Sequence, residues 1–212
     1  SLLFEKFDID TMKVLDAAKA KYNFQVHYPG AGVGGPCLPV NSYQLLNSAS
    51  KFDSNMLKIV KASREINENM PNRVIDLLID GLGIVNKNIN TSQILLLGIS
   101  YKPNVKDIQL TPAESIINKL HTSGAKVKIY DPYFVNSTVF NIETESDFIS
   151  ILPDVDAVII VTAHNEFLDL DPTLFASKMK TPIVVDTRAV LDIDDSKKAG
   201  IIYRGIGRGK FN

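Results

Sequence analysis

The sequence has 212 residues, 45% apolar and 22% charged, an ordinary globular composition with room for one large domain or two small ones. The net charge is -1 and the lysines and arginines are spread out, which excludes the basic surface of a nucleic-acid-binding protein. No apolar run approaches the roughly 20 residues that span a bilayer. One cysteine cannot form an internal disulfide, and no signal peptide or metal-binding cluster is recognisable. We therefore expect a cytoplasmic protein without membrane, metal or nucleic-acid partners.

Residues 1–88 have a helical pattern without strand-like alternation. Apolar residues recur at helical spacing in residues 2–18, and a long periodic segment runs from Asn55 onwards, which Pro71 is expected to end or kink. The first residue is a serine inside a helix-like pattern, so we expect the chain to be part of a longer protein. We expect these helices to be too few to close a core, and we predict that their apolar faces pack on a second copy or on an absent domain.

From Ser92 the pattern alternates between strands and helices. The run "QILLLGIS" is typical of a strand buried on both faces, and "TPAESIINKLHTSGA" of a helix with Thr111 as its N-cap. Four further strands follow, in "KVKIYDP", "AVIIVTAH", "PIVVDT" and "IIYRGIG", with short helices in "TESDFISILPD" and "PTLFASKM". This alternation predicts an α/β domain over residues 89–212 with a Rossmann-like parallel sheet.

Ligands of such sheets bind beyond the carboxyl ends of the strands. This rule directs attention to "GISYKPN", "DPYF", "TAHNEF" and "DTRAV". No glycine fingerprint for a dinucleotide follows the first strand, where "LLLG" continues as Ile99-Ser100-Tyr101-Lys102. The sheet is therefore not predicted to be an NAD-binding domain.

The only cysteine lies in a loop, "YPGAGVGGPCLPVNSYQLL", that contains four glycines within eight positions of it. The glycines permit positive φ angles and close approach to a ligand. The following residues are typical of a helix capped by Asn41 or Ser42, which places Cys37 just ahead of a helix N-terminus, where a thiolate is favoured. The alternative is that Cys37 is a small buried apolar residue.

Four blocks of this sequence resemble the UDP-glucose/GDP-mannose dehydrogenase family, in particular its N-acetylhexosamine branch. "PGAGVGGPCLPVNSY" is similar to that branch's PGPGVGGHCIPVDPY, "SREINENMP" to AREINDSMP, "LLLGISYKPNVKDIQLTPAESI" to VLGLAYKPNVDDLRESPALEI, and "KVKIYDPY" to VxxYDPY. The blocks occur in the family's order and spacing over nearly the whole chain. The NAD-binding domain of the family would precede Ser1.

The resemblance implies a reaction and a role for the cysteine. Members oxidise C6 of a nucleotide-sugar to a carboxylate with two NAD+, through a thiohemiacetal and a thioester on a cysteine, and Cys37 falls on that position. The resemblance also implies an all-α dimerisation domain over 1–88, followed by a UDP-sugar-binding domain over 89–212, and a homodimer.

The resemblance implies substrate contacts for further residues. Tyr28, Gly34, Tyr101, Lys102 and Arg188 fall on positions near the nucleotide-sugar, and Arg188 on one that reaches the UDP moiety. The alternatives are a loop-packing Tyr28, a solvated Lys102 and an Arg188 in a surface salt bridge. His164 and His27 are expected to be outside the site, and His164 to be structural.

The sequence departs from the family at three positions. Asn41 replaces an aspartate associated with the hydrolytic water, and a neutral amide cannot accept a proton. Gln109 replaces an arginine on the cofactor side of the cleft, and Pro36 replaces a histidine.

Three functions remain open at this level. The chain is predicted to be the central and C-terminal part of a UDP-N-acetylhexosamine 6-dehydrogenase, inactive by itself because its NAD domain is absent. The alternatives are a UDP-glucose 6-dehydrogenase and a non-catalytic nucleotide-binding or assembly module in which Cys37 is merely packed.

Overall fold

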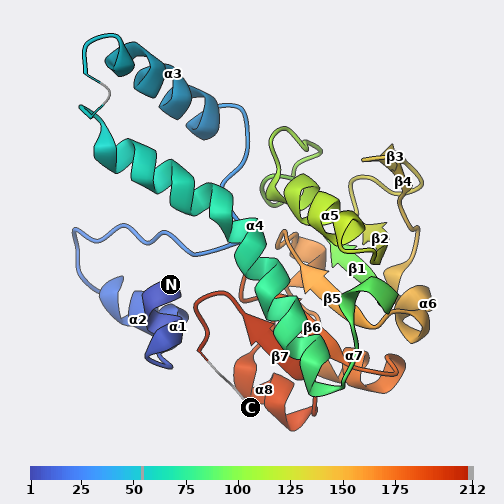
Figure 1. The fold of residues 1–212 in the computed structure, drawn as a ribbon. Helices are drawn as coiled ribbons and strands as arrows, with labels where there is room; N and C mark the ends of the chain where they lie inside the picture. The colour runs from blue at the N-terminus through green and yellow to red at the C-terminus, as the bar shows by residue number, and fades with distance from the viewer. Residues whose placement is uncertain (54, 210–212) are drawn as a thin grey trace.

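The computed structural model of the chain describes residues 1–53 and 55–209, and within them the first 88 residues contain helices and loops without strands. The helices are α1 (Leu2–Lys6), α2 (Thr11–Ala18), α3 (Leu38–Ser50) and α4 (Lys58–Ile84). Figure 1 shows α3 and the first half of α4 extending away from the rest of the molecule as a helical hairpin. The helical character predicted for this half is confirmed.

The second half alternates strands with short helices, as the sequence predicted. In chain order these are η1 (Ile89–Thr91), β1 (Gln93–Leu97), α5 (Pro112–Thr122), β2 (Lys126–Tyr130), β3 (Thr138–Val139), β4 (Ile142–Glu143), α6 (Phe148–Ile151), η2 (Leu152–Asp154), β5 (Ala157–Ile160), η3 (Asn165–Phe167), α7 (Pro172–Lys178), β6 (Ile183–Asp186), α8 (Ile193–Lys198) and β7 (Ile202–Gly205). The small β3–β4 hairpin was not predicted, because two-residue strands leave no period to read in the sequence.

Five strands form one parallel sheet in the order β2-β1-β5-β6-β7, which confirms the predicted parallel α/β fold. The chain leaves β1 for β2 on one side and then crosses back to β5 on the other side. The order of strands therefore reverses at β1, where open α/β sheets form their ligand crevice. The loop that follows β1 lies at this reversal.

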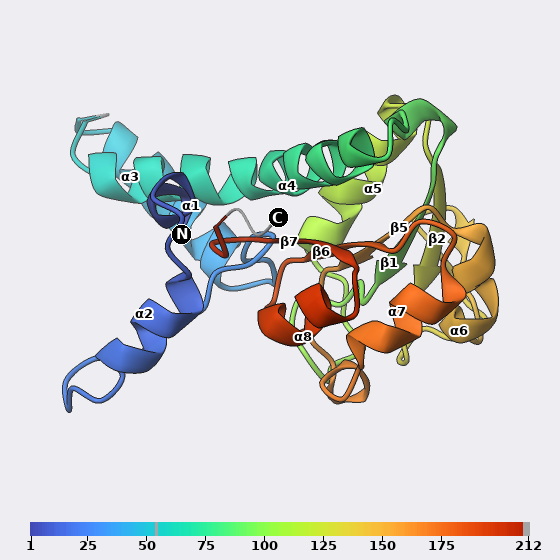
Figure 2. The ribbon, with the colours of Figure 1, turned by 90° about the horizontal axis from the view of Figure 1, so that it is seen from below.

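Helices cover both faces of the sheet, as Figure 2 shows in a view along its edge. Alternate residues of β1 point to opposite faces, so that Ile94 and Leu96 pack with α4 and α5, whereas Leu95 and Leu97 pack with α6, α7 and α8. Strand residues such as these are fully buried. The apolar run in the sequence thus forms a strand with two hydrophobic faces.

Helix α4 belongs to both parts of the molecule. Its second half, with Val74 and Leu78 fully buried, packs on the sheet beside α5, and its first half pairs with α3. The helix continues through Pro71, so of the two outcomes expected there, an end or a kink, the end does not occur. Instead, Figure 1 shows the helix bending near its middle, as expected where a proline lacks an N–H and clashes with the preceding turn.

The domain boundary predicted near residue 88 stays a prediction, since the second half of α4 shares its core with the sheet. Among the described residues, no helix is both long enough and apolar enough to cross a membrane.

Candidate functional site

Cys37 lies at the start of α3 as the N-cap residue, and its side chain is exposed. The predicted position next to a helix N-terminus is confirmed, whereas the alternative of a buried apolar cysteine is wrong. The helix begins earlier than predicted, at Leu38, because Pro39 suits the first turn of a helix. Asn41 is therefore inside the helix instead of capping it, and its N–H donates to the Cys37 carbonyl at 2.9 Å. The exposed Asn41 side chain stands one turn after Cys37 on the same side of α3.

The cysteine loop, residues 28–37, packs directly on the β1 loop, residues 98–111. The Gly35 N–H donates to the Gln109 carbonyl at 2.9 Å, and a Cβ at Gly35 would lie 2.6 Å from the Tyr101 ring. A Cβ at Gly34 would likewise overlap the Leu110 backbone. Both glycines are thus needed for contact between two loops of the protein. The Gly35 N–H is bonded within the protein and is therefore not available to a ligand.

Arg188 reaches the cysteine loop from the carboxyl end of β6. Its guanidinium lies against Gly30, where a Cβ would overlap it. Asp186 at the end of β6 accepts from the N–H groups of Arg188 at 2.9 Å and Leu191 at 2.8 Å, which fixes the turn that carries Arg188. Burial raises the pKa of Asp186, and these hydrogen bonds oppose the rise. Burial likewise lowers the pKa of Arg188, against the attraction of Asp186.

Lys102 and Tyr28 are both exposed to solvent. Lys102 is exposed, with its ammonium 5.6 Å from the Tyr101 ring centre. Tyr28 is 48% exposed at the start of the cysteine loop. The structure therefore brings Cys37, Gly34, Tyr101, Gln109 and Arg188 onto two touching loops and one strand end. The ligand contacts predicted for these residues stay predictions.

Asn67, to which the sequence assigned no role, joins α4 to the cysteine loop. Its side-chain oxygen accepts from the Val33 N–H at 2.8 Å, and its side-chain nitrogen donates to the Val33 carbonyl at 3.3 Å. Asn67 lies in the "SREINENMP" block that carried part of the resemblance, so its position was marked but its role was not. Beside this contact is a pocket of about 490 Å³ between α3, α4 and the start of α5, lined among others by Val33, Arg64 and Leu110.

A buried polar cluster lies beneath the β1 loop. Asp131, after β2, accepts from the N–H groups of Ile99 at 2.8 Å and Ser100 at 3.2 Å, and it contacts the His164 ring at 3.0 Å. Burial by itself raises the pKa of Asp131, but hydrogen bonds from His164, Ile99 and Tyr133 outweigh it and lower that pKa. His164 is completely buried, in keeping with the structural role expected of it.

Two models of protein families match this chain. Residues 1–69 match the model of the central domain of the UDP-glucose/GDP-mannose dehydrogenase family, and residues 95–193 match the model of its UDP-binding domain. The chain belongs to the UDP-glucose/GDP-mannose dehydrogenase family. The resemblance that the sequence motifs suggested is therefore confirmed.

The relatives of this chain include dehydrogenases of two substrate types. A UDP-N-acetyl-D-mannosamine dehydrogenase of Pyrococcus horikoshii is 32% identical over 209 residues, which are 99% of this chain and 47% of the relative. A UDP-glucose 6-dehydrogenase of Rhizobium meliloti is 31% identical over 184 residues, which are 85% of this chain and 41% of the relative. The chain thus spans less than half the length of these relatives.

Solved structures of family members have the same fold. The UDP-D-ManNAc dehydrogenase of P. horikoshii superposes with a TM-score of 0.85 at 28% identity, over 98% of this chain and 46% of that one. An NDP-N-acetyl-D-galactosaminuronic acid dehydrogenase of Methanosarcina mazei Go1 gives a TM-score of 0.88 at 26% identity, over 98% of this chain and 46% of that one.

The carboxyl end of β1 does not fit a dinucleotide pyrophosphate. Such a cradle needs free N–H groups and a helix that starts directly after the strand. Here the N–H groups of Ile99 and Ser100 are bonded to Asp131, and α5 starts only at Pro112. The expectation that this sheet is not itself an NAD-binding domain agrees with this geometry.

Proposed function

We propose that the chain is the nucleotide-sugar-binding and thiol-bearing part of a UDP-sugar 6-dehydrogenase, which oxidises C6 of a UDP-N-acetylhexosamine to a carboxylate. The observation that carries this proposal is the exposed Cys37 at a helix N-terminus, on a loop that packs against Tyr101 and Arg188. Family membership and dehydrogenase relatives of both substrate types support it.

Cys37 would hold the aldehyde formed at C6. Its thiolate forms an S–C bond with the aldehyde carbon, the carbonyl electron pair moves to oxygen, and that oxygen takes a proton to give a thiohemiacetal. Covalent capture retains the reactive aldehyde in the site. After oxidation to a thioester, water attacks the same carbon, the C–S bond breaks, and the carboxylate and the free thiol result. Asn41, one turn along α3 from Cys37, would orient that water by hydrogen bonding, since its amide cannot take a proton.

The two oxidations need a hydride acceptor, which we propose to be NAD+ bound mostly by a part of the protein outside this chain. The described residues do not form a dinucleotide cradle, so this chain by itself should oxidise nothing. Gln109, on the β1 loop, is proposed to face the cofactor side of the cleft.

The UDP end would be bound by the strand-end residues. Arg188 offers a planar guanidinium suited to phosphate oxygens, and Lys102 offers an exposed ammonium on the β1 loop. Tyr28 and Tyr101 supply aromatic faces, and the backbone at Gly34 borders the sugar. We also propose that the protein forms a homodimer through its helical half.

Alkylation of Cys37 tests the proposal directly, because the chain has no other thiol. We expect iodoacetamide to react faster with Cys37 than with glutathione, and saturating UDP-N-acetylhexosamine to protect it. The variant Cys37→Ser, which should not label, is the control. Slow labelling that ligands do not affect would instead support the non-catalytic module.

The same assay separates the two substrate types. UDP-N-acetylhexosamines should protect Cys37 at lower concentration than UDP-glucose, since the "PGAGVGG" form of the loop favours the N-acetyl branch. Protection by UDP-glucose at the lower concentration would instead favour a UDP-glucose 6-dehydrogenase, the alternative that relatives of similar identity keep open.

A further inference from the structure

The β1 loop makes a second set of contacts, with the segment that follows β5. Asn104 lies in this loop with φ +61, in the left-handed region. Its backbone N–H donates to His164 Nδ1 at 3.0 Å. Its side chain bonds twice to Asn165, with the amide nitrogen 2.9 Å from Asn165 Oδ1 and the amide oxygen 3.0 Å from the Asn165 N–H.

The hydrogen bonds indicate the tautomer of His164. Because Nδ1 accepts from Asn104, the ring proton lies on Nε2 and is donated to Asp131, 3.0 Å away. Asp131 in turn accepts from Ile99 and Ser100 at the base of the β1 loop. His164 therefore connects the base of this loop to Asn104.

Other side chains enclose the ring within this cluster. It is fully buried, its centroid lies 5.0 Å from that of Tyr133, and Phe167 meets it edge-on at 5.7 Å. Neither ring nitrogen is left over for a ligand, and the side chain does not reach the exposed face. Its contacts point to a role exerted through the loop.

We propose that His164 is a positioning residue, which sets the conformation of the β1 loop through its Nδ1 bond to Asn104 and thereby the affinity for the nucleotide-sugar. This inference rests on the proposed function, because Tyr101 and Lys102 between the base and Asn104 are the groups assigned to the ligand. At its far end the same loop bonds Gly35 through Gln109, so the conformation of the cysteine loop depends on it as well.

Two substitutions separate the two bonds of His164. His164→Asn places an amide oxygen near the position of Nδ1 and keeps an acceptor for Asn104, but it loses the donor to Asp131. His164→Gln places an amide nitrogen near the position of Nε2 and keeps the donor to Asp131, but it leaves the Asn104 N–H without an acceptor. Both variants remove the ring, so lost packing affects both.

The test measures UDP binding to the chain by calorimetry and amide hydrogen exchange of residues 101–109. We expect His164→Gln to lower UDP affinity about tenfold and to speed exchange of these amides, and His164→Asn to change affinity by less than about threefold. Equal affinity and exchange in the two variants would overturn the proposal.

Two controls keep the result decisive. If the unaltered chain does not bind UDP, the proposed function fails, while hydrogen exchange still tests the role of His164 in the loop. If His164→Gln does not fold, the Asn104 amide of the unaltered chain replaces it as the readout, because this N–H donates to His164 Nδ1. We then expect this amide to be protected from exchange, and UDP to slow its exchange further. Rapid exchange of the Asn104 amide that UDP does not affect would contradict the proposal.

Discussion

At the scale of single residues, the glycines of the cysteine loop show that the sequence predicted a close approach but not the group that approaches. The sequence indicated backbone that tolerates positive φ and close approach, and Gly35 has φ +86 with its α-carbon against Tyr101. The group that approaches, however, is a side chain of the β1 loop. A glycine pattern predicts that something will come close, but the identity of that group depends on how distant segments fold together.

Substitution of Gly35 tests this contact. Gly35→Ala should lower the free energy of unfolding by about 3 kcal/mol, from left-handed strain together with overlap with the Tyr101 ring. Gly200→Ala is the matched control, because Gly200 has φ +76 but open space around it and should lose only about 1 kcal/mol. Urea denaturation measures both. Equal losses would mean that Tyr101 moves aside without cost.

At the scale of elements, α4 positions the cysteine loop in addition to covering the sheet. Pro71 cannot donate to the carbonyl of Asn67, one turn earlier, and the Gly32 backbone lies next to this carbonyl. The bend in α4 therefore coincides with the place where the cysteine loop crosses it. The sequence correctly marked Pro71 as a disruption. It could not show that the buried second half of the helix would stabilise continuation instead of an end.

The contact between α4 and the cysteine loop can be removed by one substitution. Asn67→Ala deletes both hydrogen bonds to Val33, and we expect a loss of about 1 kcal/mol in stability and faster hydrogen exchange of the Val33 amide. Asn72→Ala is the control on the same helix, since the exposed Asn72 side chain bonds no described residue but Asn69. If both variants left Val33 exchange unchanged, Asn67 would not hold the loop.

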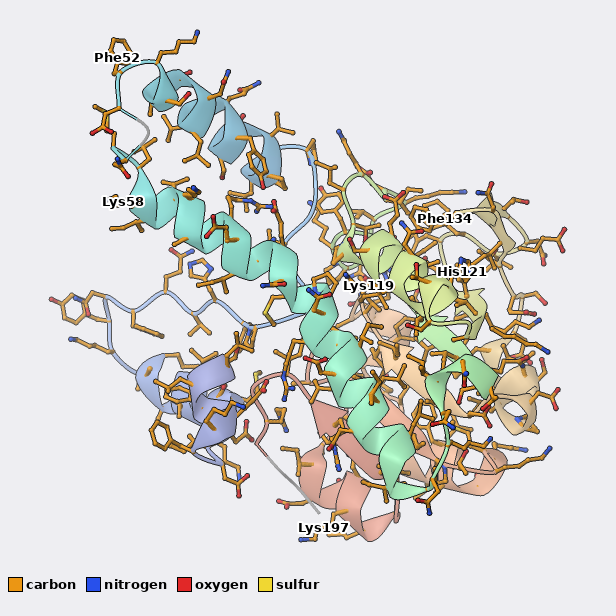
Figure 3. All side chains as sticks on the ribbon, in the orientation of Figure 1. Phe52, Lys58, Lys119, His121, Phe134 and Lys197 are labelled. Carbon is orange, nitrogen blue, oxygen red and sulfur yellow. The ribbon has the colours of Figure 1, made fainter. Side chains whose placement is uncertain are left out.

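At the scale of the whole molecule, the helical hairpin carries apolar side chains that the chain does not cover. Phe52 and Ile59 are each 84% exposed, and Met56 and Ile66 are 61% and 58% exposed. Figure 3 shows Phe52 and Lys58 at the end of the hairpin that points away from the sheet. Exposed apolar surface of this kind marks an interaction site, which agrees with the proposed homodimer.

We expect the chain to sediment as a dimer, and Ile59→Glu to raise the dimer dissociation constant at least about tenfold by introducing a charge into the interface. Leu168→Glu is the control, because Leu168 is also exposed, at 55%, but follows η3 on the side of the sheet. A stable monomer of the unaltered chain at high concentration would contradict the dimer.

The sequence by itself determined most of the elements and the family of this protein. Buried strands, capped helices and the cysteine loop are encoded in neighbouring residues, whose periodicity and turn chemistry act over a few positions. The resemblance identified the family because its motifs are local blocks in a fixed order. The same local information placed Cys37 at a helix start.

Tertiary structure alone decided which of these local features meet. The contacts of Gly35 with Gln109, of Asn67 with Val33 and of His164 with Asn104 join segments 34 to 74 residues apart. Such pairs form because a parallel sheet brings its carboxyl ends to one edge and a long helix crosses beside it. No short stretch of sequence contains both partners, and so the arrangement of the site appears only in the folded chain.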